Sequence, residues 1–239
     1  MIVQRPAASR GRGPAAAGWL DSRHSFSFGQ YYDPDWMGFG ALRVVNEDRV
    51  APGAGFAPHR HANMEILSYV LSGRLAHRDS SGAEGVVGPG ELQWMSAGHG
   101  VEHSEYNASG EESVHFLQVW IQPDRVNAEP AYAHRPASQA PGWQLLASPD
   151  GAAGSIAIRQ QARLYRLALE PGEEAAFDLD ADQRYWLHVA RGDVESGGQR
   201  LGAGDAVGLV DEEGGLVLAG SDPGAEVLLF ELPGPGRAQ

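Results

Sequence analysis

The chain of 239 residues contains neither cysteine nor lysine. Without cysteine there are no disulfides, thiolate metal ligands or thiol nucleophiles. Without lysine there is no Schiff-base lysine and no lysine of a Walker-type phosphate loop. All 18 basic residues are arginine. A metal site in this chain would therefore have to use imidazole nitrogens or oxygen ligands.

Long apolar runs are also missing. No stretch approaches the roughly 20 apolar residues of a membrane span, and residues 1–20 lack the apolar core of a secretory signal. The formal net charge is −13, which leaves no basic surplus for a phosphate backbone. We therefore expect a cytoplasmic protein that binds neither membrane nor nucleic acid.

Turn-forming residues are plentiful, with 32 glycines and 15 prolines. Many tight turns are typical of a β-rich chain, and helical periodicity is faint. Residues 114–121 and 225–232 alternate in hydrophobicity as strands do. We predict a mainly β fold, with the first-half strands at 40–46, 64–71, 74–79, 91–95 and 113–121.

Two stretches, 69–95 and 188–210, follow one plan. Each has an apolar strand, a glycine turn, a short strand, a glycine-containing hairpin, and a Pro-Gly-Glu or Ala-Gly-Asp turn into another strand. Such a repeat predicts two related β-barrel or sandwich domains. The Pro- and Ala-rich segment 122–142 is the expected linker, and we divide the chain into domains 1–130 and 131–239.

The sequence places two pairs of potential metal ligands at a spacing of two. His59 and His61 form one pair, and His103 and Glu105 the other. On a strand, residues i and i+2 project to one face, with Cβ atoms on the order of 6–7 Å apart. Either pair alone is a weak signal, but facing strands would bring three imidazoles and a carboxylate together. This donor set suits Fe(II), Mn, Ni, Cu or Zn.

Other histidines and aromatic residues have a plainer interpretation. His77 and His115 are expected to be structural, and His188 to be a packing or surface residue. His24 with Phe26 and Phe28 fits the mouth of an apolar pocket and a core equally well. Four further aromatic residues are first interpreted as packing residues: Trp19, Trp94, Trp120 and Tyr106. No Gly-x-Ser-x-Gly motif supports a serine hydrolase.

These motifs resemble those of a known family. Gly53-x₅-His59-x-His61-x₃-Glu65 and Gly100-x₂-His103-x₃-Asn107 are similar to the two cupin motifs. The stretches 19–44, 58–73, 88–98 and 101–107 resemble the pirin family, and most of all the bacterial pirin-like quercetin 2,3-dioxygenases. Two positions depart from the family pattern: Arg60 stands where proline is usual, and His99 where a small polar residue or arginine is expected.

The resemblance implies an all-β bicupin, with two stacked jelly-roll barrels and few short helices. Only the N-terminal domain would hold a metal, through His59, His61, His103 and Glu105. Generic cupins take the carboxylate from the first motif, here Glu65, whereas pirins take it from the second. We therefore favour Glu105, and Glu65 would either orient a ligand histidine or be a structural carboxylate.

The implied activity is the oxidative ring cleavage of flavonols such as quercetin by O₂. Fe(II) is the first expected metal, with Ni, Mn, Cu, Co or Zn as alternatives, and Glu105 would accept the substrate hydroxyl proton. The protein is expected to be a monomer. Two alternatives stay open: a metal-dependent regulatory or redox-sensing protein with a protein partner, and a cupin enzyme with another small aromatic substrate.

Overall fold

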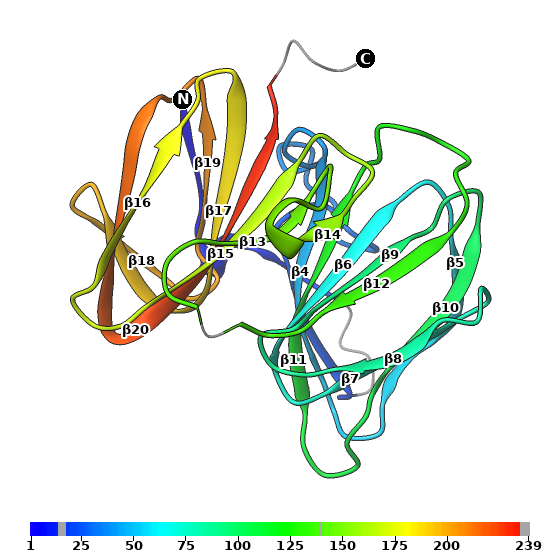
Figure 1. Cartoon of the computed structure of the whole chain (residues 1–239). Coiled ribbons are helices and arrows are strands. Elements are labelled where there is room, and N and C mark those ends of the chain that lie inside the picture. The colour runs from blue at the N-terminus through cyan, green and yellow to red at the C-terminus, as the bar shows by residue number, and fades with distance from the viewer. Residues whose placement is uncertain (14–17, 139, 235–239) are drawn as a thin grey trace. The chain divides into compact units, whose positions relative to one another are not determined.

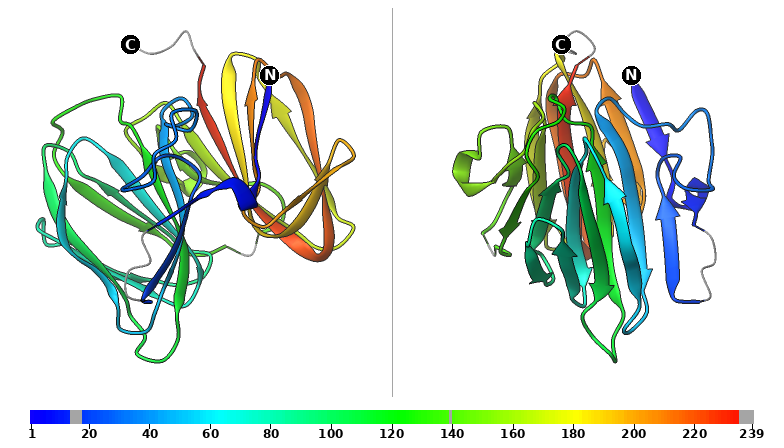
Figure 2. Two further views of the ribbon diagram at one scale, coloured as in Figure 1. Left: turned by 180° about the vertical axis from the view of Figure 1, so that it is seen from behind. Right: turned by 90° about the vertical axis from the view of Figure 1, so that its right-hand side faces the viewer.

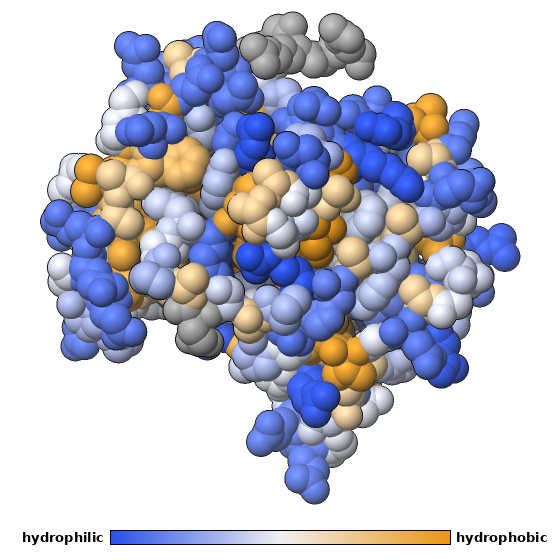
Figure 3. All heavy atoms as spheres, in the orientation of Figure 1, coloured by the Kyte–Doolittle hydropathy of each residue, from blue (hydrophilic) through white to orange (hydrophobic). Residues whose placement is uncertain are grey.

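The computed structural model describes residues 1–13, 18–138 and 140–234. Its elements are β-strands, apart from two short 3₁₀ turns, η1 (Ala7–Ser9) and η2 (Ala152–Gly154) (Figure 1). The all-β prediction is therefore confirmed. No helix among the described residues is long and apolar enough to cross a membrane. On the face shown in Figure 3, hydrophobic residues lie in small groups among hydrophilic ones.

The chain divides into two compact units. One unit contains residues 11–138 and 158–160, and the other contains 1–10, 139–157 and 161–239. The predicted boundary after residue 130 falls inside the first of these units, because β12 (Ala131–Arg135) pairs with β9 (Leu92–Ser96) there. Part of the expected linker is thus a strand, and residue 139 within it lies outside the described residues. The first ten residues belong to the other unit because β1 (Ile2–Arg5) pairs with β19 (Ala206–Val210), as Figure 2 shows.

Two antiparallel sheets form the unit of residues 11–138, which we call the N-unit. The larger sheet has seven strands, in the order β12, β9, β6 (Glu65–Ser72), β11 (Val114–Ile121), β4 (Leu42–Val50), β3 (Leu20–His24) and β2 (Gly11–Arg12). The smaller sheet has four strands, in the order β5 (Gly55–His61), β10 (Val101–Asn107), β7 (Leu75–Asp79) and β8 (Glu84–Val87).

The alternation in β10 decides which of its side chains face the interior of the N-unit. Val101, His103, Glu105 and Asn107 are buried, whereas the residues between them are at least partly exposed. This period of two is what a strand with one buried face requires. His103 and Glu105 therefore point inward together, as their spacing predicts.

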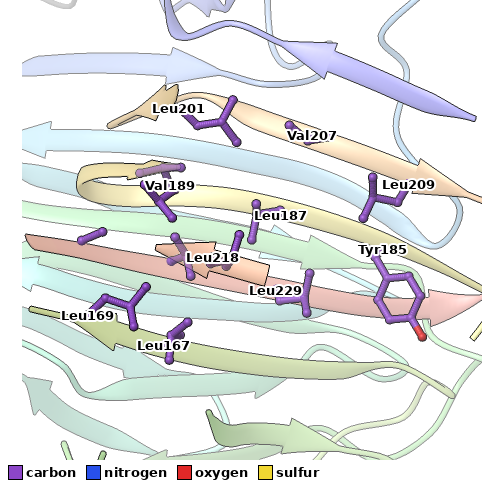
Figure 4. Close-up of a cluster of buried hydrophobic side chains, with 13 residues drawn as sticks. Leu167, Leu169, Tyr185, Leu187, Val189, Leu201, Val207, Leu209, Leu218 and Leu229 are labelled. Carbon is purple, nitrogen blue, oxygen red and sulfur yellow. The ribbon is translucent and has the colours of Figure 1, made fainter. Parts of the chain in front are cut away.

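Nine strands form one sheet in the other unit, which we call the C-unit. The main path is β1, β19, β17 (Gln183–Ser196), β20 (Gly214–Pro233), β15 (Arg163–Leu169), β13 (Gln144–Ser148) and β14 (Ile156–Ala157). β16 (Glu174–Leu179) pairs with β20, and β18 (Gln199–Gly202) pairs with β17. Its core is a cluster of buried leucines, valines and Tyr185 from these strands (Figure 4).

The internal repeat reappears as matching strand pairs. In the N-unit, β6 pairs with β9 and β7 with β8; in the C-unit, β17 pairs with β19 and with β18. The glycines at the first turns, Gly73 and Gly192, both have positive φ, 75° and 63°. A Cβ at Gly192 would lie 1.8 Å from the carbonyl oxygen of Gly224, so only glycine fits. The same turn chemistry thus shapes both units.

Candidate metal centre

Three histidines of the smaller N-unit sheet lie together. His59 and His103 occupy paired positions on β5 and β10, and their ring centroids are 4.5 Å apart. The ring of His61 lies 4.8 Å from that of His59 and 4.9 Å from that of His103. One nitrogen from each ring lies within 4.8 Å of the others. The structure therefore groups the three histidines that the spacing pointed to.

Hydrogen bonds fix which nitrogen of His59 faces the cluster. Its Nδ1 lies 2.8 Å from the carbonyl oxygen of Ala57, and a carbonyl can only accept, so Nδ1 carries the proton. Its Nε2 then presents a lone pair, 3.0 Å from Nε2 of His103. A shared cation would satisfy both nitrogens, so the donor set fits a metal ion.

The surroundings favour the neutral forms of His61 and His103. Burial, together with the neighbouring His103 and His59, lowers the pKa of His61 to about 4. Burial and the neighbouring His59 and His77 lower the pKa of His103 to about 3. Both imidazoles are therefore unprotonated at neutral pH, which is the state that binds a metal.

His77, which we expected from the sequence to be a structural residue, contacts His103. His77 Nε2 is 3.0 Å from Asp79 Oδ2, and its Nδ1 is 3.5 Å from Nδ1 of His103. Hydrogen bonds from Ser81, His77 and backbone N–H groups outweigh burial and lower the pKa of Asp79. The Asp79 carboxylate can hold the proton of His77 on Nε2, so that His77 Nδ1 accepts from His103 and leaves His103 Nε2 free. In the sequence, the spacing His77-x-Asp79 is the feature that could have indicated this pair.

Glu105 is held by the larger sheet. Its Oε1 accepts hydrogen bonds from Ser68 Oγ and Gln93 Nε2, both at 3.1 Å, and its Oε2 accepts one from Gln118 Nε2 at 2.7 Å. Glu105 forms a second potential ligand group with His77 and His103. It also lines one pocket with His59 and His61. Its ligation of a metal stays a prediction.

Glu65 lies elsewhere. It is fully buried on β6, where Trp94 Nε1 and the backbone N–H of Arg159 donate to Oε2 and Ser96 Oγ donates to Oε1, at distances of 2.8, 2.9 and 2.5 Å. None of these partners is a predicted metal ligand. Of the two roles left open for Glu65, the structure therefore supports the structural one.

A row of polar side chains crosses the larger sheet. Gln93, Ser68, Gln118, Asn46 and His24 are successive cross-strand partners on β9, β6, β11, β4 and β3. Directly paired residues of antiparallel strands project to the same face. Three of the five residues donate to Glu105, namely Gln93, Ser68 and Gln118. Gln118, Asn46 and His24 line the pocket. We call this set of five residues the polar row.

The pocket has a volume of about 250 Å³, and part of its wall is aromatic. Leu20, Phe28, Phe56 and Trp120 line it beside the histidines. The Trp120 ring meets His61 and Phe28 edge-on, with centroids 4.8 and 5.3 Å away. Trp120 is thus a pocket residue and not only a packing residue. Phe28 belongs to the pocket, and Phe26 is buried in the core.

Other predicted positions fall outside the cluster. Arg60 is exposed and pairs with Glu102, so this departure from the family pattern changes only the outer face. His99 is exposed and lies 3.2 Å from Glu129. His115 bonds to Glu47, and His188 is buried in the C-unit. Both potential ligand groups among the described residues lie in the N-unit.

Two β units with one strand plan, the first carrying a histidine cluster at a pocket, define a two-domain cupin. Comparison with protein families agrees with this class. Residues 4–121 match the Pirin family, and residues 145–232 match the quercetinase C-terminal cupin domain.

Relatives resemble the chain over almost its whole length. A quercetin 2,3-dioxygenase of Escherichia coli K12 is 45% identical, with 98% of this chain and 99% of the relative covered. A pirin-like protein of Caulobacter vibrioides is 39% identical, with 92% and 95% covered. The crystal structure of the E. coli bacterial pirin YhhW in complex with nickel(II) has a TM-score of 0.91 and 44% identity, covering 98% of this chain and 100% of that one. The chain belongs to the pirin family.

Proposed function

We propose that the chain is a metal-dependent dioxygenase that cleaves the central ring of a flavonol such as quercetin with O₂. The observation that carries this proposal is the cluster of His59, His61 and His103 opening onto an aromatic-walled pocket that Glu105 also lines. The E. coli relative named quercetin 2,3-dioxygenase supports the same activity.

The metal would be held by His59, His61, His103 and Glu105. Neutral imidazoles and a carboxylate without thiolate suit Fe(II), which we propose as the native metal, and also Ni, Mn, Cu, Co or Zn. The relative that was crystallised with nickel(II) supports a divalent ion of this kind. When bound, the metal supplies Lewis acidity toward the substrate hydroxyl and an electronic path to O₂.

The chain itself supplies substrate placement and proton transfer. Phe28, Phe56 and Trp120 offer ring faces and edges to a planar aromatic molecule and exclude water from its reacting side. Glu105 is oriented by Ser68, Gln93 and Gln118, and we propose that it accepts the proton of the substrate hydroxyl. In the overall reaction, flavonol and O₂ give a depside and carbon monoxide.

The pocket favours a small-molecule reaction over the alternative of signalling through a protein partner, because an apolar cavity beside the ligand cluster is what an aromatic substrate requires. Another small aromatic substrate would fit the same features. The monomeric state and the cytoplasmic location stay predictions from the sequence.

The test is aerobic turnover of quercetin. Protein freed of metal is reloaded separately with Fe(II), Ni(II), Mn(II) or Cu(II), and loss of quercetin absorbance is followed together with release of carbon monoxide. We expect turnover with at least one metal and none with His61→Ala under the same loading. Absence of turnover with every metal would contradict the proposed activity.

A further inference from the structure

Four polar residues form a second polar wall of the pocket, apart from the proposed metal ligands. Ser22 and His24 come from β3, and Asn46 and Asp48 from β4. The register pairs His24 with Asn46 and Ser22 with Asp48, so all four project to the same face of the larger sheet. We call these four residues the β3–β4 wall.

The hydrogen bonds of this wall run in one direction. Ser22 Oγ donates to Asp48 Oδ1, so the same oxygen is an acceptor toward His24 Nε2, which lies 2.8 Å away. His24 and Ser22 thus hold the Asp48 carboxyl in one orientation. Both are buried, and Asp48 is only 4% exposed.

Within the part of the chain that the structure describes, two acceptors of this wall lack a protein donor. The hydrogen bonds of Asp48 end at Oδ1, and Asn46 Oδ1 is buried without a partner. Buried acceptors are normally satisfied, and an acceptor that lines a cavity can be satisfied by a ligand. Glu105 differs, because three side chains already donate to it. The β3–β4 wall is therefore the part of the pocket with hydrogen-bonding capacity to spare.

We propose that Asp48, held by Ser22 and His24 and with Asn46 beside it, binds a second phenolic hydroxyl of the substrate, distinct from the hydroxyl at the metal. A hydroxyl donor is the complement of a carboxylate oxygen and an amide oxygen. Asp48 is then a specificity-determining residue that selects polyhydroxylated aromatic molecules. This inference rests on the proposed function for the identity of the first hydroxyl.

The charge of Asp48 sets the conditions for a test. Burial raises its pKa to about 7; the hydrogen bond from Ser22 lowers it, and the carboxylates of Glu105, Glu47 and Asp21 raise it further. At pH 8.5 the group is mainly a carboxylate, which forms the stronger hydrogen bond to a phenol.

The experiment measures binding without turnover. Nickel-loaded protein is titrated anaerobically at pH 8.5 with quercetin and with 3-hydroxyflavone, whose single hydroxyl would be at the metal. We expect Asp48→Asn to weaken quercetin binding by about 10- to 100-fold, the range for a hydrogen bond to a charged group. Its affinity for 3-hydroxyflavone should change less than about twofold. Asp21→Asn removes an exposed carboxylate from the neighbouring strand β3 and should leave both affinities unchanged.

Equal losses for both ligands, or no loss for either, would overturn the inference. Ser22→Ala provides a second variant, which should weaken quercetin binding by about threefold, because Asp48 loses the hydrogen bond that orients it. Should Asp48→Asn fail to fold, a Ser22→Ala protein with unchanged preference for quercetin would overturn it. Aerobic turnover is scored separately: if no flavonol is consumed but the preference still depends on Asp48, the proposed function fails and the hydroxyl subsite stands.

Discussion

Nε2 of His59 and Nε2 of His103 face each other at 3.0 Å across paired positions of β5 and β10. Ala57 holds the proton of His59 on Nδ1, so a cation could bind between the two facing Nε2 atoms. We expect His103→Ala to lose most of the metal that the unaltered protein binds. His99→Ala removes an exposed histidine four residues away and should retain the metal in full. Metal content after dialysis, measured by mass spectrometry, checks this, and a fully loaded His103→Ala protein would contradict the ligand assignment.

Glu105 and Glu65 should respond differently to the same substitution. Glu105→Gln removes a proposed ligand and should lower the affinity for Ni(II) by at least about tenfold. Glu65→Gln should leave that affinity unchanged, but it disturbs a fully buried carboxylate with three donors. An unsatisfied buried polar group costs about 1–3 kcal/mol, so the free energy of unfolding should fall by that amount. Nickel titration and denaturant unfolding of both variants separate the two roles, and equal nickel affinities would count against Glu105.

His77 should act on the metal through His103. His77→Phe keeps an aromatic ring against Tyr132 but removes the acceptor for His103 Nδ1. Loss of such an orienting partner typically costs 10- to 100-fold in metal affinity, and we expect a loss of about that size. His115→Phe, which replaces a histidine paired with Glu47 outside the ligand cluster, is the matched control. An unchanged Kd for nickel in His77→Phe would show that its contact with His103 has no orienting role.

Asp48 should make the metal-free protein less stable at alkaline pH. Its folded pKa of about 7 lies above the unfolded value of 3.8, so the folded state binds the proton more tightly. This contribution is fully present below about pH 3.8 and is lost as the pH rises to about 7. Asp48→Asn cannot ionise and should therefore gain about 2–4 kcal/mol relative to the unaltered protein between pH 4 and pH 8. Denaturant unfolding of both proteins at the two pH values checks this; an equal difference at both would contradict it.

The sequence predicted which of the proposed ligand side chains share a face, because that geometry is local. Residues two apart on a strand project to the same face, and His103 and Glu105 on β10 are both buried on one face. Spacing could not choose between Glu65 and Glu105, since Glu65 shares the odd numbering of His59 and His61. The choice depends on the chain reversal between β5 and β6, where Asn63 has a φ of 52°. It also depends on the N–H of Arg159, far along the chain.

The polar row could not be predicted for a related reason. Its residues lie on five strands, separated by some twenty or more positions along the chain, and only the strand register makes them neighbours. Register follows from the packing of whole strands, which no short motif encodes. The contact between His77 and His103 could not be predicted either, because the two residues meet only through the pairing of β7 with β10.

Glu105 belongs to the four-stranded sheet of the N-unit, whereas all three of its hydrogen-bond donors belong to the seven-stranded sheet. The smaller sheet thus supplies the proposed ligands, and the larger sheet orients one of them, Glu105, through hydrogen bonds. Metal affinity would then report how closely the two layers are packed. Core substitutions that loosen this packing, even far from the pocket, should register as faster release of the ion before any loss of secondary structure. A metal-release assay could therefore measure how well the two sheets of this domain are packed.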